Sequence, residues 1–326
     1  MSRLLSTVSA ITFIAGTYAS ADVPKVVADI APIHSLVSRV MDGVGEPKLI
    51  VPNETSPHDY RLRPADAEAI EDANLVFWMG EGLTPWMERA LEALSNDTDI
   101  IEFLALEEST LLSFREGALF EAHDHSDHDD HDDHDDHDKD HDDHDDHDDH
   151  AGHDHGEYDP HAWLSTNNAK TWLNVIAARL SSIDPDNAGA YFANASEARG
   201  EMDALDVEIN TMLDPVRGGK FVVFHDAYQY FETVYDFPAS GAISLGDASD
   251  PSAARVAEIA NRIKSENIAC VLSEPQFNAG LVKTVMGGTD ATTEVIDPLG
   301  FGIEPGKSLY PKLIRAMAQS LVNCLK

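Results

Sequence analysis

Short apolar runs alternate with amphipathic stretches along the first hundred residues. The runs at 25–30, 48–51, 74–79 and 98–103 have the length and the apolar content of buried strands. A helix is predicted to start at Thr84-Pro85, because Thr is a frequent N-cap and Pro suits the first helical position. Strands that alternate with helices predict a parallel sheet with crossover connections.

Longer helical patterns and a second alternation follow. Residues 166–183 predict a helix that Asp184-Pro185 ends, and residues 187–213 predict one of about 40 Å at 1.5 Å per residue. Helices of this length often connect domains. Further strands are predicted at 220–224, 268–272 and 293–296, and further helices at 251–266 and 307–325. The fold class is therefore α/β, with two parallel-sheet lobes joined by one long bridging helix.

The length fits this division. A chain of 326 residues with 43% hydrophobic residues suits two domains and excludes global disorder. We expect a first lobe over 22–184, a bridging helix over 185–214 and a second lobe over 215–326.

The charge is strongly negative and unevenly spread. The formal net charge is -37, which argues against nucleic acid or an anionic membrane as a partner and suits a cation. Residues 123–155 contain 12 His, 17 Asp and one Lys. Most of this run repeats His-Asp-Asp, which has almost nothing to bury, so we expect it to be disordered without ligand.

This run is typical of metal capture, since imidazole and carboxylate are good ligands for Zn²⁺ and similar ions. The alternative, a solvated acidic linker, does not explain the histidines. A flexible segment suits several weak, exchangeable ions, so we predict an accessory role rather than the principal site. Its histidines are His123, His125, His128, His131, His134, His137, His141, His144, His147, His150, His153 and His155.

The N-terminus indicates export. Arg3 precedes a mainly apolar run that ends in Ala19-Ser20-Ala21, the pattern of a signal peptide over residues 1–21. In an oxidising compartment, the chain's two cysteines, Cys270 and Cys324, are most simply a disulfide between a buried strand and the C-terminal helix. A thiolate metal site is the alternative, but it needs more soft ligands.

Four histidines lie outside the run. His225 directly follows a predicted strand, as do the carboxylates Glu274 and Asp297, and ligands of open α/β folds bind beyond such strand ends. His58 and His161 lie in loops of the first lobe. If the lobes face each other, three imidazoles and one carboxylate converge in the cleft, a plausible tetrahedral Zn²⁺ shell. The fourth histidine, His34, lies in an apolar helix start and is predicted to be structural.

Five motifs in order carry a resemblance over essentially the whole mature chain. They are Pro57-His58-Asp59-Tyr60, Asp159-Pro160-His161-Ala162-Trp163, Phe224-His225-Asp226-Ala227-Tyr228, Glu274-Pro275-Gln276-Phe277 and Asp297-Pro298-Leu299-Gly300. With them, and with the His/Asp-rich insert, the chain resembles the periplasmic zinc-binding proteins of ABC importers (the ZnuA type, in the metal-binding cluster A-I of solute-binding proteins).

The resemblance implies two lobes bridged by one long helix and a metal site of His58, His161 and His225 in the cleft. The fourth ligand varies in the family. We prefer Asp297, with Glu274 as an alternative ligand or as a residue behind the ligands. Some zinc members use a Glu just before the first His, but Pro57 stands there in this chain. The cysteine pair also matches a disulfide of some zinc-type members.

The implied function is high-affinity capture of Zn(II) in the periplasm and delivery to a membrane permease with its ATPase, without enzymatic activity. A periplasmic zinc chaperone is a further partner to consider, and a monomer is expected. One alternative is a manganese- or iron-type importer subunit, although His225 stands where manganese members usually carry Glu. Another is a periplasmic zinc buffer that acts through the His-rich run. A zinc hydrolase is disfavoured, because no H-E-x-x-H or comparable arrangement is present.

Overall fold

The computed structural model describes residues 23–95, 98–115, 120, 158–244, 251–275 and 279–326. The predicted signal peptide and the His/Asp-rich run at 123–155 lie outside the described residues.

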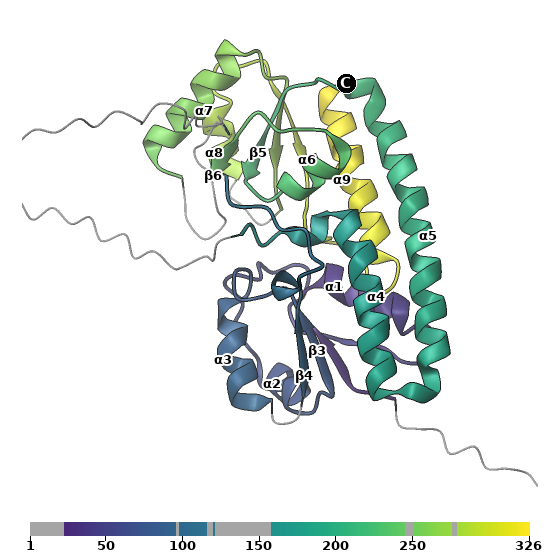
Figure 1. Cartoon of the computed structure of the whole chain (residues 1–326). Coiled ribbons are helices and arrows are strands. Elements are labelled where there is room, and N and C mark those ends of the chain that lie inside the picture. Colours follow the sequence, from purple (N-terminus) through teal and green to yellow (C-terminus); the bar gives the residue numbers. More distant parts are fainter. Residues whose placement is uncertain (1–22, 96–97, 116–119, 121–157, 245–250, 276–278) are drawn as a thin grey trace, which may run out of the picture.

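The first lobe is built on a parallel sheet with the strand order β2-β1-β3-β4. The two central strands, β1 and β3, are buried along their whole length, because helices lie on both sides of the sheet (Figure 1). All four predicted strands are confirmed, with shorter bounds. The strands are β1 Val26–Ala28, β2 Lys48–Leu49, β3 Leu75–Trp78 and β4 Asp99–Glu102, and the helices are α1 Ala31–Val40, α2 Pro64–Glu71 and α3 Pro85–Leu94.

Helix α3 begins where the sequence predicts, with Pro85 in its first turn. The cap itself differs from the expectation. The hydroxyl of Thr84 does not accept a bond from the helix, and instead it donates to the carbonyl of Gly80 at 3.4 Å. Thr84 therefore marks the boundary by its position rather than by a side-chain cap.

The second lobe repeats the first one's topology, with a parallel sheet in the order β6-β5-β7-β8. Three elements were not predicted: the three-residue β6 and the seven-residue helices α6 and α8. The elements are β5 Phe221–His225, α6 Gln229–Tyr235, β6 Ala242–Ser244, α7 Ala253–Ser265, β7 Cys270–Ser273, α8 Ala279–Val285, β8 Thr292–Val295 and α9 Leu309–Leu325.

The predicted disulfide is confirmed. Cys270 in β7 and Cys324 in α9 are bonded, with their Cα atoms 5.5 Å apart. Both residues are buried, so the bond fixes the C-terminal helix to the centre of the second sheet.

Two long helices run along one side of the molecule (Figure 1). Helix α4 spans Thr166–Ile183 as predicted, and the Ser165 hydroxyl caps it by accepting from the backbone N–H of Asn168 at 3.2 Å. The expected bridging helix is α5, Ala188–Leu213, which extends beside both lobes for 26 residues.

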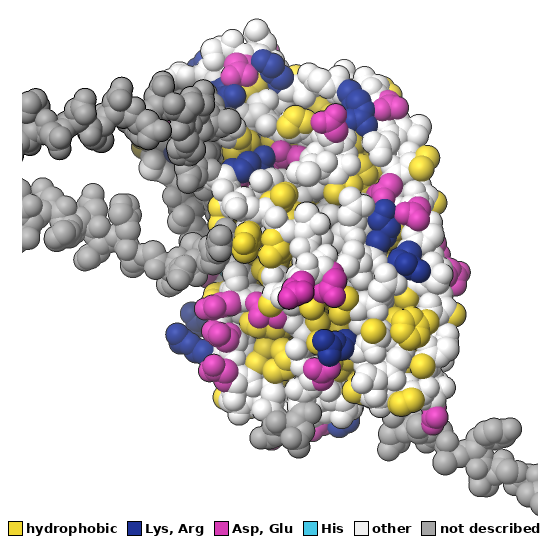
Figure 2. All heavy atoms as spheres, in the orientation of Figure 1, with side chains coloured by type: hydrophobic (Ala, Val, Ile, Leu, Met, Phe, Trp, Pro, Cys, Tyr) yellow, Lys and Arg dark blue, Asp and Glu magenta, His cyan; other side chains and the backbone are white. Residues whose placement is uncertain are grey.

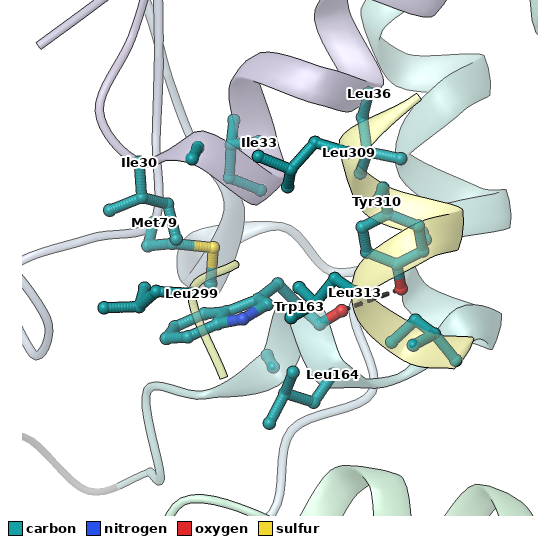
Figure 3. Close-up of a cluster of buried hydrophobic side chains, with 14 of the residues drawn as sticks. Ile30, Ile33, Leu36, Met79, Trp163, Leu164, Leu299, Leu309, Tyr310 and Leu313 are labelled. Carbon is teal, nitrogen blue, oxygen red and sulfur yellow. Dashed lines mark hydrogen bonds between the residues drawn. The ribbon is translucent and has the colours of Figure 1, made fainter. Parts of the chain in front are cut away.

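The lobes also share an apolar core. Leu309, Tyr310 and Leu313 of α9 belong to the same buried cluster as Ile33 and Leu36 of α1 (Figure 3). In the same cluster the Tyr310 hydroxyl donates to the carbonyl of Trp163 at 2.8 Å (Figure 3). The lobes are therefore joined by buried apolar packing as well as by helix α5.

The surface carries charges of both signs. Figure 2 shows Lys and Arg side chains interspersed with Asp and Glu over the visible face of the described residues. Among the helices in the described parts of the chain, none is long and apolar enough to cross a membrane.

Candidate metal centre

A small cavity lies where the two lobes meet. Its volume is about 20 Å³, room for one ion or one water molecule. Trp163 and Leu299, which form part of its wall, belong to the shared apolar cluster (Figure 3). The cavity is lined by Ser56, Pro57, His58, Leu83, His161, Trp163, His225, Glu274, Pro298 and Leu299.

His161 is held by the turn that precedes α4. The carboxylate of Asp159 accepts from the backbone N–H of His161 at 2.9 Å and from its ring Nδ1 at 2.7 Å. A carboxylate can only accept here, so Nδ1 carries a proton, and in the neutral imidazole the lone pair is on Nε2. Both side chains are almost fully buried, at 7% exposure for His161 and 1% for Asp159. The turn therefore holds the ring of His161 in one orientation, with Nε2 pointing away from Asp159.

His225 is held in the same way by the second sheet. It ends β5, and Glu274 follows β7, the neighbouring strand. The Oε1 atom of Glu274 accepts from the Nδ1 of His225 at 2.6 Å, and both residues are buried. A carboxylate behind an imidazole fixes the tautomer and increases the basicity of the opposite nitrogen, as in carboxylate–histidine–zinc arrangements.

The two fixed nitrogens face each other across the cavity. The Nε2 atoms of His161 and His225 are 3.4 Å apart. Two nitrogens bound to one tetrahedral zinc at 2.0–2.1 Å stand about 3.3–3.4 Å apart by geometry alone. This pair therefore has the spacing of two ligands of one zinc ion.

His58 lines the cavity from the first lobe but stands further back. Its ring centroid is 6.2 Å from that of His161, and its side chain is half-buried. The neighbouring Pro57 carbonyl accepts from Trp86 Nε1 at 2.8 Å, which anchors the loop on α3. Among the residues described, no group of three or more His, Cys, Asp or Glu side chains stands ready to hold a metal ion. The ring centroid of His58 thus lies farther from that of His161 than the ring centroid of His225 does, which is 5.2 Å away.

Asp297 is placed differently from Glu274. It is not among the cavity-lining residues, and its carboxylate accepts from the backbone N–H groups of Leu299, at 2.9 Å, and of Phe301. The negative charge of Asp297 nevertheless acts on a residue next to the cavity, Tyr228. Burial first, and then the negative charges of Glu274 and Asp297, raise the pKa of Tyr228 well above its usual range. In this structure Asp297 organises its own turn.

The remaining residues comprise one predicted to be structural, one that was not predicted, and several that lie outside the described residues. His34 is buried outside the cavity, with Nε2 3.0 Å from the carbonyl of Pro47, as expected of a structural histidine. Asp159 was not predicted as a site residue, although it precedes His161 by two positions, the spacing of an Asx turn. The accessory histidines and part of the Glu274 motif, Gln276 and Phe277, lie outside the described residues.

Comparison with known proteins agrees with this architecture. The family described as "Zinc-uptake complex component A periplasmic" matches residues 26–324. The high-affinity zinc uptake system protein ZnuA of Brucella abortus (strain 2308) is 46% identical over 332 residues, covering 100% of this chain and 99% of the relative. The protein of the same name from Paracoccus denitrificans (strain Pd 1222) is also 46% identical, covering 94% of this chain and 93% of the relative.

Among solved structures, a ZnuA deletion mutant with zinc bound superimposes with a TM-score of 0.71 at 23% identity, covering 94% of this chain and 99% of that one. This likeness concerns the fold. The resemblance and the fold predicted from the sequence are thereby confirmed, and the chain belongs to the family of periplasmic zinc-uptake components of the ZnuA type.

Proposed function

We propose that this protein captures Zn²⁺ in the cleft between its lobes and delivers it to the permease of an ABC importer. The observation that carries the proposal is the pair of buried Nε2 atoms 3.4 Å apart, each on an imidazole that a carboxylate holds from behind. The names of the relatives, all zinc uptake proteins, support the same conclusion.

The ligands proposed are His161, His225, His58 and a carboxylate. Glu274 bonds the Nδ1 of His225, on the opposite side of the ring from a metal at Nε2, so its role is to orient that histidine. We therefore retain Asp297 as the fourth ligand. Its carboxylate can bind a metal while it keeps its backbone bonds, because an ionised carboxylate has about four lone-pair sites.

Zinc suits this donor set better than manganese does. Imidazole nitrogen is a good ligand for zinc, whereas manganese favours oxygen donors. We propose no enzymatic activity, because a shell of four protein ligands leaves no position for an activated water.

The cellular setting follows from the family. We propose that residues 1–21 direct export and are removed, that the mature chain acts in the periplasm as a monomer, and that its partners are the permease and, through it, the cytoplasmic ATPase. A periplasmic zinc chaperone is a proposed donor. The His-rich run at 123–155 serves as an accessory store of exchangeable ions.

The test is a chelator-competition titration with Zn²⁺ on the mature chain, on the same chain without residues 123–155, and on His225→Ala. We expect one tight ion in the first two and a loss of at least about a hundredfold in affinity in the third, because a removed ligand costs several kcal/mol. His34→Ala is the matched control, since it removes a buried histidine outside the cavity.

The outcomes distinguish a transport site in the cleft from a zinc buffer that acts through the His-rich run. An unchanged affinity in His225→Ala, or loss of tight binding on deletion of the run, would place the function in the run and reject the cleft.

A further inference from the structure

Arg115 brings one positive charge between two buried carboxylates beside the metal centre. Its guanidinium donates to both oxygens of Asp226, with Nε 3.0 Å from each, and to both oxygens of Glu232, at 2.7 and 3.0 Å. Asp226 and Glu232 are 6% and 5% exposed. The guanidinium also lies over the ring of Phe120, 3.6 Å from its centroid. The proposed function assigns no role to this cluster.

The partners of Arg115 belong to the turn that carries His225. Asp226 directly follows that histidine at the end of β5, and Glu232 lies in α6, the next helix. Arg115 itself comes from the segment before the insert, far away in sequence. Its bonds therefore hold the β5–α6 turn to a segment that precedes the second lobe in the sequence.

The same segment also fixes the turn that carries His161. The backbone N–H of Asp159 donates to the carbonyl of Leu112 at 2.8 Å. The hydroxyl of Tyr230 bridges the same two residues, since it accepts from the N–H of Leu112 and donates to the carbonyl of Asp159, at 2.9 Å each. Asp159 in turn bonds the ring of His161. Residues 112–115 thus contact both turns that present the facing Nε2 atoms.

We propose that Arg115 is a positioning residue of the metal centre, which sets the separation of His161 and His225 by clamping their two turns to one segment. The proposal rests on the proposed function, because it concerns the same pair of histidines. An arginine is suited to the task, since its planar guanidinium reaches both oxygens of two carboxylates at once, whereas the single ammonium nitrogen of a lysine lacks this fork geometry.

A purely structural role is the competing explanation. Removing Arg115 alone leaves two buried carboxylates without their cation, which destabilises any fold. A test must therefore separate the charge balance from the clamp.

Two variants of the full chain make this separation. Arg115→Lys keeps the charge but loses the two-sided fork, and the triple variant Arg115→Met, Asp226→Asn, Glu232→Gln removes the charges together. Arg39→Met with Glu201→Gln is the matched control, because it removes an ion pair between α1 and α5 whose residues do not line the cavity.

The readouts are Zn²⁺ affinity by chelator competition and the visible spectrum with one equivalent of Co²⁺, with His225→Ala as the baseline for ions bound elsewhere. We expect both folded Arg115 variants to bind Zn²⁺ about tenfold or more weakly, the effect typical of residues that orient ligands, and to show an altered Co²⁺ spectrum. The control should keep both properties.

Wild-type affinity and spectrum in either folded Arg115 variant would overturn the positioning role. Failure of the proposed function is a separate result, since it appears as tight binding in His225→Ala whatever the Arg115 variants do.

Discussion

At the scale of residues, equivalent positions in the two lobes carry different residues with different roles. The two sheets have the same strand order, and in each the two central strands end side by side. In the second lobe this place holds His225 bonded to Glu274. In the first lobe it holds Asp29, whose carboxylate accepts from the N–H groups of Ile30 and Met79, at 2.7 Å each. The first pair thus lines the cavity between the lobes, whereas Asp29 holds two backbone N–H groups.

Asp29 makes stability depend on pH. It is fully buried, and burial raises its pKa to about 7, against the opposing effect of its backbone bonds. Because the folded state holds this proton more tightly than the unfolded state, the stabilisation is complete below the ordinary aspartate pKa of 3.8 and is lost as pH rises to about 7. We expect the wild type to lose about 3 kcal/mol relative to Asp29→Asn between about pH 4.5 and 7.

The measurement is urea unfolding of both metal-free proteins across this range. The comparison cancels the other titrating groups, which the two proteins share. Parallel stability curves would show that Asp29 is ionised in the folded state.

At the scale of elements, helices α4 and α5 were predictable because each offers many turns of unbroken pattern and clear ends, such as Asp184-Pro185. The missed elements are short. Strand β6 has three residues and α6 has two turns, too few to establish a period. Strand β6 is defined by its pairing with β5, a contact that its own three residues do not predict.

Helix α5 carries a glycine that its packing does not require. Gly200 is exposed in the middle of the helix, and a Cβ there would meet no atom within 4 Å. Alanine restricts the unfolded chain and favours the helix, so Gly200→Ala should raise the free energy of unfolding by about 0.5–1 kcal/mol.

Gly300 supplies the opposite case in the same experiment. Its φ of +84° is strained for alanine, and a Cβ would lie 3.4 Å from the Leu309 side chain. Gly300→Ala should therefore lower the free energy of unfolding, measured by the same urea titration. Equal effects of the two substitutions would contradict the assignment of Gly200 to an unconstrained helical position.

At the scale of the whole molecule, the sequence predicted which strand ends carry the chemistry but not how the lobes are joined. Strand-end positions of His225 and Glu274 follow from local pattern, because the carboxyl ends of parallel strands meet at one edge. The buried cluster around Trp163, Leu299 and Tyr310 unites segments from both halves of the chain (Figure 3). Long-range packing of this kind has no local signal, which is also why the Arg115 clamp could not be predicted.

This shared core restricts the motion available for zinc capture. Besides α5, the lobes are tied by Tyr310 to Trp163 and by the Asn53 amide, which donates to the carbonyl of Ile303 at 2.9 Å. Opening the lobes would expose the apolar cluster, so movement should be confined to the loops that carry His58 and Asp297. In the chain without residues 123–155, we expect Zn²⁺ to leave the radius of gyration in solution scattering unchanged and to slow amide exchange mainly at 52–62 and 297–303.

The His225→Ala protein provides the control, since it should show no such protection. The Asn53→Ala variant tests the restraint directly. It removes a contact between the lobes without removing a cavity residue, so zinc should still protect both loops in it. Protection spread along α5 together with a smaller radius of gyration would instead indicate hinge closure, and the shared core could then not be the element that holds the lobes in place.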